Sequence, residues 1–229
     1  EVERVREGLP AAIAKGTDWT TPTGSYFTPQ PLGDQGDVAF VYPGAFNVYL
    51  GLGQHLFRLF PELYERFSDT IGEMARVTDL LMLYPRSLTR LSKDDMRVLE
   101  TCMLEDSVSM LELGTHFAML YTMLLRDIFG VQPTRVFGYS QGETSMLHAM
   151  HVWTESNIAT DALRTSDIYR TRLSGPKLAT REFWGVDSAT IPDDALWANY
   201  LVMAPAQQLQ PLLEQEPRVY LVITNAPGE

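Results

Sequence analysis

A chain of 229 residues is long enough for one sizeable domain, or for one domain with a small appendage. Its 18 basic and 29 acidic residues give a formal net charge of −11, which argues against nucleic acid or an anionic membrane as a partner. The single cysteine, Cys102, excludes an intrachain disulfide framework. No secretory leader opens the chain, and no run approaches about 18 consecutive apolar residues, so we expect a cytoplasmic protein without a membrane span.

The first 37 residues are expected to form a helix followed by a linker. Apolar residues recur at three-to-four spacing through residues 1–15, which indicates a short amphipathic helix. Residues 16–36 are rich in glycine, proline and small polar residues, and this composition predicts an irregular connector.

Residues 38–192 alternate strand-like and helix-like segments. Runs of β-branched and aromatic residues predict strands at 38–42 and 135–138. Helices are predicted at 48–59, from 61 onward, at 93–104, at 107–129 and at 143–152, and a short apolar segment covers 79–84. The helix at 107–129 is apolar almost all round, which implies burial. The alternation indicates an α/β core with a mostly parallel sheet.

The C-terminal residues, 193–229, form a separate pattern. Strands are predicted at 197–203 and 218–224, with a helix at 205–215 between them. Such a β-α-β unit is half of a ferredoxin-like sandwich and cannot readily bury its own sheet face. We therefore expect the first, incomplete part of a small ferredoxin-like subdomain.

The most informative stretch is Arg135–Glu143, in which a strand-like run leads into Gly-Tyr-Ser-Gln-Gly and then into a helix. This order predicts a nucleophile elbow, with Ser140 on a strained turn that projects its hydroxyl clear of the sheet. Gly138 and Gly142 would let the strand and helix pass closely. The backbone N–H of Gln141, at a helix N-terminus, would face a developing oxyanion.

Two segments together resemble malonyl-transferase-type acyltransferases. Residues 38–46 look like the first-strand motif of that family, and residues 130–133 and 138–143 resemble its Gly-x-x-Pro turn and serine elbow. Outside these motifs, residues 26–29 and 145–147 are similar to the acyltransferase subunits of bacterial polyunsaturated fatty acid synthases.

The resemblance implies an α/β-hydrolase-like core and a ping-pong acyltransferase of fatty acid or polyketide synthesis. Ser140 would take an acyl group from coenzyme A, as in malonyl-CoA, or from a phosphopantetheine thioester, and pass it to a carrier-protein thiol. The implied partners are acyl-CoA, an acyl carrier protein and other synthase domains. No bound cofactor is expected.

The same resemblance assigns the residues around the nucleophile. The backbone N–H groups of Gln141 and Ala45 would form the oxyanion hole, with Ala45 standing where the family has a glutamine. Tyr139 replaces the usual elbow histidine, and Phe46 replaces a glycine of the loop. Both replacements enlarge the apolar surface at the predicted site.

An arginine on the helix after the elbow helix binds the carboxylate of the extender unit in this family. Residues 168–173 resemble that stretch, which makes Arg170 the first candidate and Arg172 the second. A planar guanidinium suits the task because it can bind a carboxylate through two parallel hydrogen bonds. A surface arginine on a helix is the alternative interpretation, and the choice between malonyl and a longer acyl chain stays open.

The general base of the family is a histidine that lies beyond the small subdomain. The four histidines of this chain lie elsewhere, and all four are expected to be core or helix-surface residues: His55, His116, His148 and His151. We therefore expect the base outside this chain. The i,i+3 spacing of His148 and His151 could place both on one helix face, but without a carboxylate or cysteine at matching spacing no metal site is predicted.

Two other functions remain open. A serine hydrolase or thioesterase is the first alternative, because Gly-Tyr-Ser-Gln-Gly also occurs in cutinase-like esterases. Those enzymes are secreted and disulfide-bonded, and they lack the Tyr-Pro-Gly loop and Glu143. The second alternative is a non-enzymatic docking domain of a megasynthase, which only the missing histidine supports.

Overall fold

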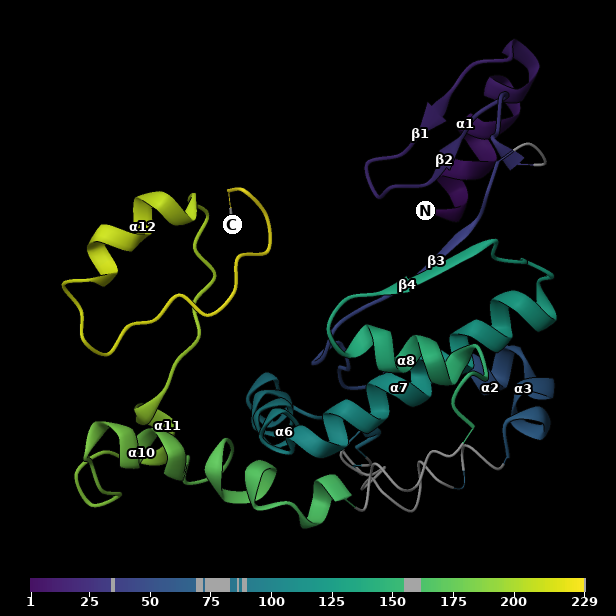
Figure 1. The fold of residues 1–229 in the computed structure, drawn as a ribbon. Helices are drawn as coiled ribbons and strands as arrows, with labels where there is room; N and C mark the ends of the chain where they lie inside the picture. The colour runs from purple at the N-terminus through teal and green to yellow at the C-terminus, as the bar shows by residue number, and fades with distance from the viewer. Residues whose placement is uncertain are drawn as a thin grey trace. The chain divides into compact units, whose positions relative to one another are not determined.

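The computed structural model describes residues 1–33, 36–68, 72, 83–85, 87, 90–154 and 162–228 (Figure 1). The chain divides into two compact units, Glu1–Asn157 and Ile158–Glu229, and each is described by itself. The domain boundaries expected from the sequence stay a prediction.

The N-terminal helix predicted at residues 1–15 is confirmed as α1, Val2–Lys15. The connector that follows was expected to be wholly irregular, and this expectation is wrong. Two short strands, β1 (Trp19–Thr20) and β2 (Tyr26–Phe27), pair antiparallel within it.

The β1–β2 hairpin is fixed to α1 by the carboxylate of Glu1 and the indole ring of Trp19. The Glu1 carboxylate accepts hydrogen bonds from the hydroxyls of Thr21, Thr23 and Ser25, and these bonds lower the pKa of Glu1 to about 2. Trp19 packs so closely on α1 that a Cβ at Gly8 would lie 2.4 Å from the indole nitrogen. Side-chain contacts to α1 therefore order a segment whose local composition favours a loop.

Both predicted core strands are confirmed, and they lie side by side. β3 (Ala39–Tyr42) pairs in parallel with β4 (Arg135–Gly138), with Ala39 opposite Arg135 and Tyr42 opposite Gly138. The mixed α/β class predicted from the sequence is thus confirmed, through a two-stranded parallel sheet in the described part of this unit.

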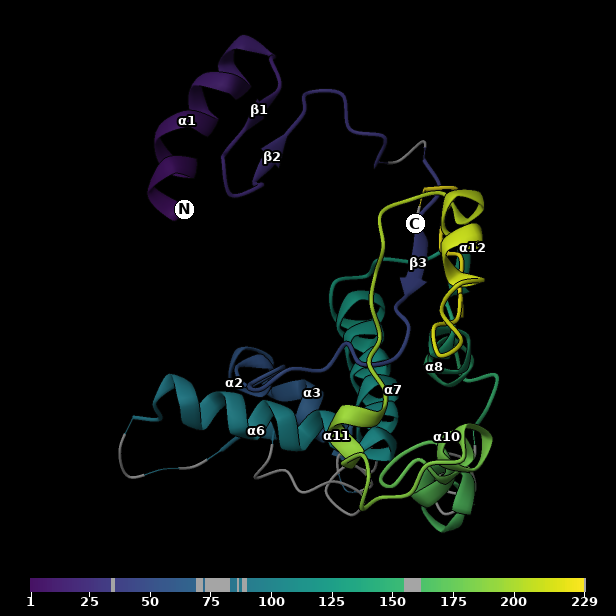
Figure 2. The same cartoon turned by 90° about the vertical axis from the view of Figure 1, so that its left-hand side faces the viewer.

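Helices lie along one face of the sheet and build the core of the first unit (Figures 1 and 2). Besides α1, its longer helices are α6 (Lys93–Glu105), α7 (Ser107–Met123) with its π-helical continuation (Leu124–Ile128), and α8 (Gln141–Ala149). The short helices α2 (Leu56–Leu59) and α3 (Pro61–Arg66) precede them. These elements confirm the helices predicted from residue 61, at 93–104 and at 107–129.

The helix predicted at 48–59 is largely wrong, because only its last four residues are helical. Gly51 and Gly53, with φ of 82° and 71°, adopt the left-handed conformation and break the helical pattern. Most of the apolar segment predicted at 79–84 lies outside the described residues.

The core of the first unit is centred on α7. Its buried members are Val48, Leu52, Leu63, Phe67, Leu83, Met103, Met110, Leu113, Phe117, Leu120 and Leu124. By length and composition alone, the helical stretch 107–128 could cross a membrane, with a mean hydropathy of 1.3, but 61% of that apolar window is buried by protein. This burial is typical of the core helix of a folded domain.

The described helical elements of the second unit include a π-helical turn (Ile168–Arg172), α10 (Leu178–Trp184), α11 (Asp193–Leu196) and α12 (Ala206–Leu213). The helix predicted at 205–215 is confirmed by α12. The two strands predicted around it are wrong, because residues 197–203 and 218–224 form no strand in the described structure. A ferredoxin-like half-sandwich is therefore not formed here.

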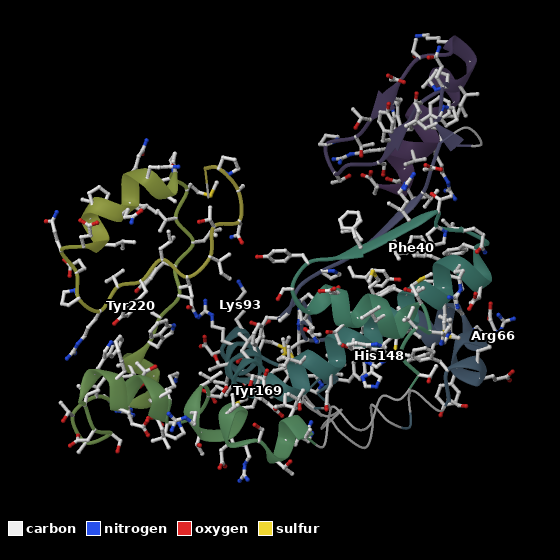
Figure 3. All side chains as sticks on the ribbon, in the orientation of Figure 1. Phe40, Arg66, Lys93, His148, Tyr169 and Tyr220 are labelled. Atoms are coloured by element: carbon white, nitrogen blue, oxygen red, sulfur yellow. The ribbon has the colours of Figure 1, made fainter. Side chains whose placement is uncertain are left out.

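Aromatic stacking holds those two segments instead of a sheet. Trp197 and Tyr220 each stack on Trp184, with ring centroids 5.8 and 6.4 Å from its own (Tyr220 is labelled in Figure 3). Trp184 also donates a hydrogen bond of 2.9 Å from Nε1 to the Tyr220 hydroxyl. Two parallel strands without further partners are marginal, so side-chain packing sets the backbone path.

Two glycines allow α8 to cross the sheet. A Cβ at Gly142 would lie 2.1 Å from the carbonyl oxygen of Tyr42, and a Cβ at Gly138 would lie 2.1 Å from the carbonyl carbon of Gly142. Since real Cβ atoms essentially never come this close to backbone atoms, both positions require glycine. The close passage predicted for these two residues is confirmed.

We expect the substitution Gly142→Ala to destabilise the first unit by about 1–3 kcal/mol or more, because the methyl group must displace backbone rather than a movable side chain. Urea denaturation followed by circular dichroism measures this loss. Gly33→Ala is the matched control, since its Cβ would make ordinary contact at 3.9 Å. Equal stability of the two variants would contradict the steric argument.

Candidate active site

The predicted strand–turn–helix around Ser140 is present. Ser140 joins β4 to α8 with φ 55° and ψ −124°, a conformation that L-residues seldom adopt. The turn is tied down on both sides, because Tyr139 donates its N–H to the Tyr42 carbonyl at 3.2 Å and Gly142 donates to the Tyr139 carbonyl at 2.8 Å. The Ser140 side chain is exposed. This geometry presents a serine hydroxyl to solvent on a strained, anchored turn.

The loop after β3 lies against this turn. A Cβ at Gly44 would lie 3.5 Å from the Ser140 Cβ and 3.2 Å from the Tyr139 ring. The next residue is Ala45, and Phe46 then takes a left-handed conformation, with φ 62°, while its side chain is 53% exposed. Pairing of β3 with β4 therefore brings the loop of Ala45 to the elbow of Ser140.

The side chain of Gln141 anchors the elbow to α7. Its Nε2 donates to the carbonyl oxygen of Leu111 and, at 3.3 Å, to the hydroxyl of Thr115. The Thr115 hydroxyl also pairs with Ser145 of α8 at 3.2 Å. Sequence reasoning missed Thr115, because no motif links residue 115 to residue 141.

An apolar groove of about 450 Å³ runs between β3 and α7. It is lined by residues 39–43 of the strand and its loop, by Asn47, and by α7 residues that include Phe117 and Tyr121. Below the strand, the Tyr42 hydroxyl pairs with the hydroxyl of Thr122 at 2.8 Å. No sequence pattern indicates this groove, because its two walls lie about 80 residues apart along the chain.

The two candidate arginines lie in the second unit, and both are exposed. Arg172 binds the Glu182 carboxylate through both terminal nitrogens, at 3.2 and 2.8 Å, which raises the pKa of Arg172 and lowers that of Glu182. A substrate carboxylate at Arg172 would have to displace Glu182. Arg170 therefore remains the better of the two candidates, and its role stays a prediction.

A third arginine, Arg181, was not singled out from the sequence, and its role is structural. Its side chain is 5% exposed and donates to the carbonyls of Pro176, Asp187 and Ile191, each at 2.8 Å, and to the Asp193 carboxylate at 2.6 Å. These bonds join α10 to the loop and helix that follow it.

The four histidines occupy structural or surface positions. His116 is buried in α7, with Nδ1 2.7 Å from the Glu112 carbonyl oxygen. His148 is buried near the end of α8 and packs edge-on against Trp153, with ring centroids 5.6 Å apart (Figure 3). Eight residues of helix separate it from Ser140, roughly 12 Å along the axis. In the described structure, the Ser140 hydroxyl makes no hydrogen bond to any histidine.

Among the described residues, no three or more His, Cys, Asp or Glu side chains gather in a way that would hold a metal ion. The groups that the turn offers for chemistry are the exposed serine and the surrounding backbone amides.

Comparison with known proteins places this geometry in context. The chain is 30% identical to one subunit of a polyunsaturated fatty acid synthase from Thraustochytrium over 228 residues, which cover 98% of the chain and 11% of that protein. The resemblance to polyunsaturated fatty acid synthases is confirmed. The similarity also includes the N-terminal helix and hairpin, which the sequence motifs did not reach.

A second similarity is more limited. The chain is 27% identical to the non-reducing polyketide synthase ZEA1 of Gibberella zeae over 122 residues, or 53% of the chain and 6% of that protein. The chain thus spans about a tenth or less of the relatives it matches. No family model matches the sequence, and no solved structure matches it.

The buried ring of His148 generates a pH prediction. Burial lowers the pKa of His148, and a hydrogen bond with the Trp153 backbone opposes this effect in part. As the pH falls below about 6.5, protons bind the unfolded chain first, so the free energy of unfolding decreases until the folded pKa is reached.

We expect His148→Gln to flatten the pH dependence of unfolding between pH 7 and 5. The measurement is urea denaturation at a series of pH values. His55→Gln is the control, because the exposed His55 can be replaced while His148 stays in place. An unchanged pH profile in His148→Gln would show that other groups govern the acid destabilisation.

Proposed function

We propose that this chain is an acyltransferase domain of a fatty acid or polyketide synthase. It moves an acyl group from coenzyme A, or from an acyl carrier protein thioester, through an ester on Ser140 to a carrier-protein thiol. The observation that carries the proposal is the Ser140 turn, exposed and held at φ 55° between β4 and α8. Sequence similarity to two synthases supports the assignment to such an assembly.

The first half-reaction builds the acyl-enzyme. The Ser140 hydroxyl attacks the thioester carbonyl carbon, the C–S bond breaks, and the hydroxyl proton passes through a general base to the departing thiolate. In the second half-reaction, the thiol of a carrier protein attacks the ester and Ser140 regains its proton. The reaction needs no resident cofactor.

The backbone N–H groups of Gln141 and Ala45 are proposed as the oxyanion hole. Gln141 is the first residue of α8, where amide protons have no partner within the helix. Ala45 lies next to Gly44, which contacts the turn. Because a main-chain group donates, the change from the family's glutamine to alanine need not abolish the hole, although it removes a side chain that could position the loop.

A histidine of the full-length protein is proposed as the general base. His116 and His148 are buried in structural contacts, and neither His55 nor His151 makes a hydrogen bond to Ser140 in the described residues. Within the same proposal, β3 and β4 are the central strands of an α/β-hydrolase-like sheet.

The proposed substrate preference depends on the positive charge of Arg170 and on the aromatic rings of Tyr139 and Phe46. Arg170 is exposed, and its guanidinium would bind the carboxylate of a malonyl group. Tyr139 and Phe46, 57% and 53% exposed, flank the turn and favour an uncharged or longer acyl chain. Acyl carrier protein and neighbouring synthase domains are the proposed partners.

We expect Ser140→Ala to abolish the covalent acyl adduct while leaving the fold intact, because an exposed turn serine contributes little packing. Intact-protein mass spectrometry of the full-length protein after incubation with acyl-coenzyme A is the measurement. A matched exposed serine, Ser87, serves as the control through Ser87→Ala.

Four outcomes separate the candidate functions and test the nucleophile. Transfer of radiolabelled acyl groups from Ser140 to carrier protein supports the acyltransferase, and transfer to water alone supports a thioesterase. Undiminished acyl loading of the Ser140→Ala variant would show that Ser140 is not the nucleophile. A wild-type protein that never loads would favour the docking-domain interpretation.

The role of Arg170 generates a separate prediction. If Arg170 binds the carboxylate, Arg170→Ala should slow malonyl loading by about 30-fold or more, because breaking one partner of a desolvated charge pair costs about 2–5 kcal/mol. Acetyl and medium-chain loading should stay near the wild-type rate. Equal losses on all three acyl-coenzyme A substrates would show that Arg170 is structural, and a wild-type preference for the medium chain would discard the malonyl interpretation.

A further inference from the structure

The side chain of Gln141 makes contacts separate from those of its backbone. Whereas the backbone N–H of this residue is the proposed oxyanion donor, its carboxamide lies in the contact between α8 and α7. Both hydrogens of Nε2 are used, one toward the Leu111 carbonyl and one toward the Thr115 hydroxyl at 3.3 Å.

The Thr115 hydroxyl is the centre of this contact. It donates to the Leu111 carbonyl at 3.2 Å, which leaves its two lone pairs for Gln141 and for the Ser145 hydroxyl at 3.2 Å. Ser145 is 3% exposed and lies one helical turn after Gln141. The hydroxyl thus joins α7 to α8 at two successive positions of the elbow helix.

The absence of a side chain at Gly114 makes room for the contact. A Cβ there would lie 3.6 and 3.8 Å from the carboxamide atoms of Gln141 and 3.2 Å from Oδ1 of Asn47. Asn47 belongs to the loop after β3, one residue beyond Phe46. The side chain of Gln141 from the elbow and the side chain of Asn47 from the loop after β3 therefore both lie beside Gly114 of α7.

We propose that Gln141 and Thr115 are positioning residues for acyl transfer at Ser140. The clamp formed by Gln141, Thr115 and the Leu111 carbonyl fixes the first residue of α8, and with it the direction of the Gln141 N–H. The Ser140 turn is strained and needs such support to keep one conformation. This inference rests on the proposed function and deepens it.

The test removes the side-chain hydrogen bonds of the clamp and keeps the backbone N–H of residue 141. Gln141→Met keeps the length of the side chain and removes both hydrogen bonds, and Thr115→Val keeps the shape and removes the hydroxyl. Since an amide displaced by about 1 Å can cost roughly 100-fold, we expect Gln141→Met to slow Ser140 acylation by about 10- to 100-fold with KM unchanged. Thr115→Val should lose less, and Thr115→Ser should recover most of the rate.

A matched control lies in the hairpin that follows α1. The buried Thr21 hydroxyl donates to the Glu1 carboxylate at 2.5 Å and pairs with Thr23 at 3.2 Å, and neither bond involves the elbow or α7. Thr21→Val should lower the melting temperature while leaving the acylation rate constant of the full-length protein unchanged. It therefore separates positioning of Ser140 from a general loss of stability.

The double variant gives the decisive reading. If Thr115 acts through Gln141, then Gln141→Met with Thr115→Val should be no slower than Gln141→Met alone. Additive losses, a wild-type acylation rate in Gln141→Met, or a change confined to KM would overturn the clamp. Each rate is compared with the acylation rate of Ser140 in the wild-type protein. If the wild-type protein is not acylated at Ser140, the proposed function is wrong, and the positioning role of the clamp is refuted with it.

Discussion

The crossing of three backbone segments at the elbow is the constraint on which the site depends. β3, the turn after β4 and the first turn of α8 approach so closely that Gly138 and Gly142 have no room for a Cβ. Parallel pairing of the strands sets this approach, since Tyr42 lies opposite Gly138 and its carbonyl accepts the N–H of Tyr139. A serine at the apex is then forced into a conformation that exposes its hydroxyl. Local strain at Ser140 is thus a consequence of how the strand and helix pack, and packing elsewhere compensates for it.

Helix α7 provides that compensation. It is buried in the core through Met110, Leu113 and Leu120, each at most 1% exposed, so it does not move independently of the unit. Its polar residues on the α8 side bind the elbow, while Thr122 further along binds β3 through Tyr42. A rigid apolar helix with a few polar side chains thus carries both the stability of the unit and the orientation of the turn.

The sequence predicted the parts of this arrangement that local pattern controls. The β-branched and aromatic runs of β3 and β4 and the glycines of the elbow are local signals of this kind. The clamp on Gln141 was not predictable in this way, because Leu111 and Thr115 meet it only when α7 and α8 pack. Tertiary contacts also overrode local composition in the hairpin that Glu1 and Trp19 organise. At Gly51 and Gly53 the helix prediction failed for a local reason, because both glycines adopt a left-handed conformation.

The second unit shows the limit of period-two patterns most clearly. Residues 197–203 and 218–224 are rich in strand-forming residues, yet in the described structure Leu201 and Ile223 remain 68% and 64% exposed. A strand needs a backbone partner as well as propensity, and burial of one face requires a layer to cover it. Here three stacked rings and the hydrogen bonds of Arg181 hold the unit together. A stable sheet from these segments would need additional strands or a covering helix.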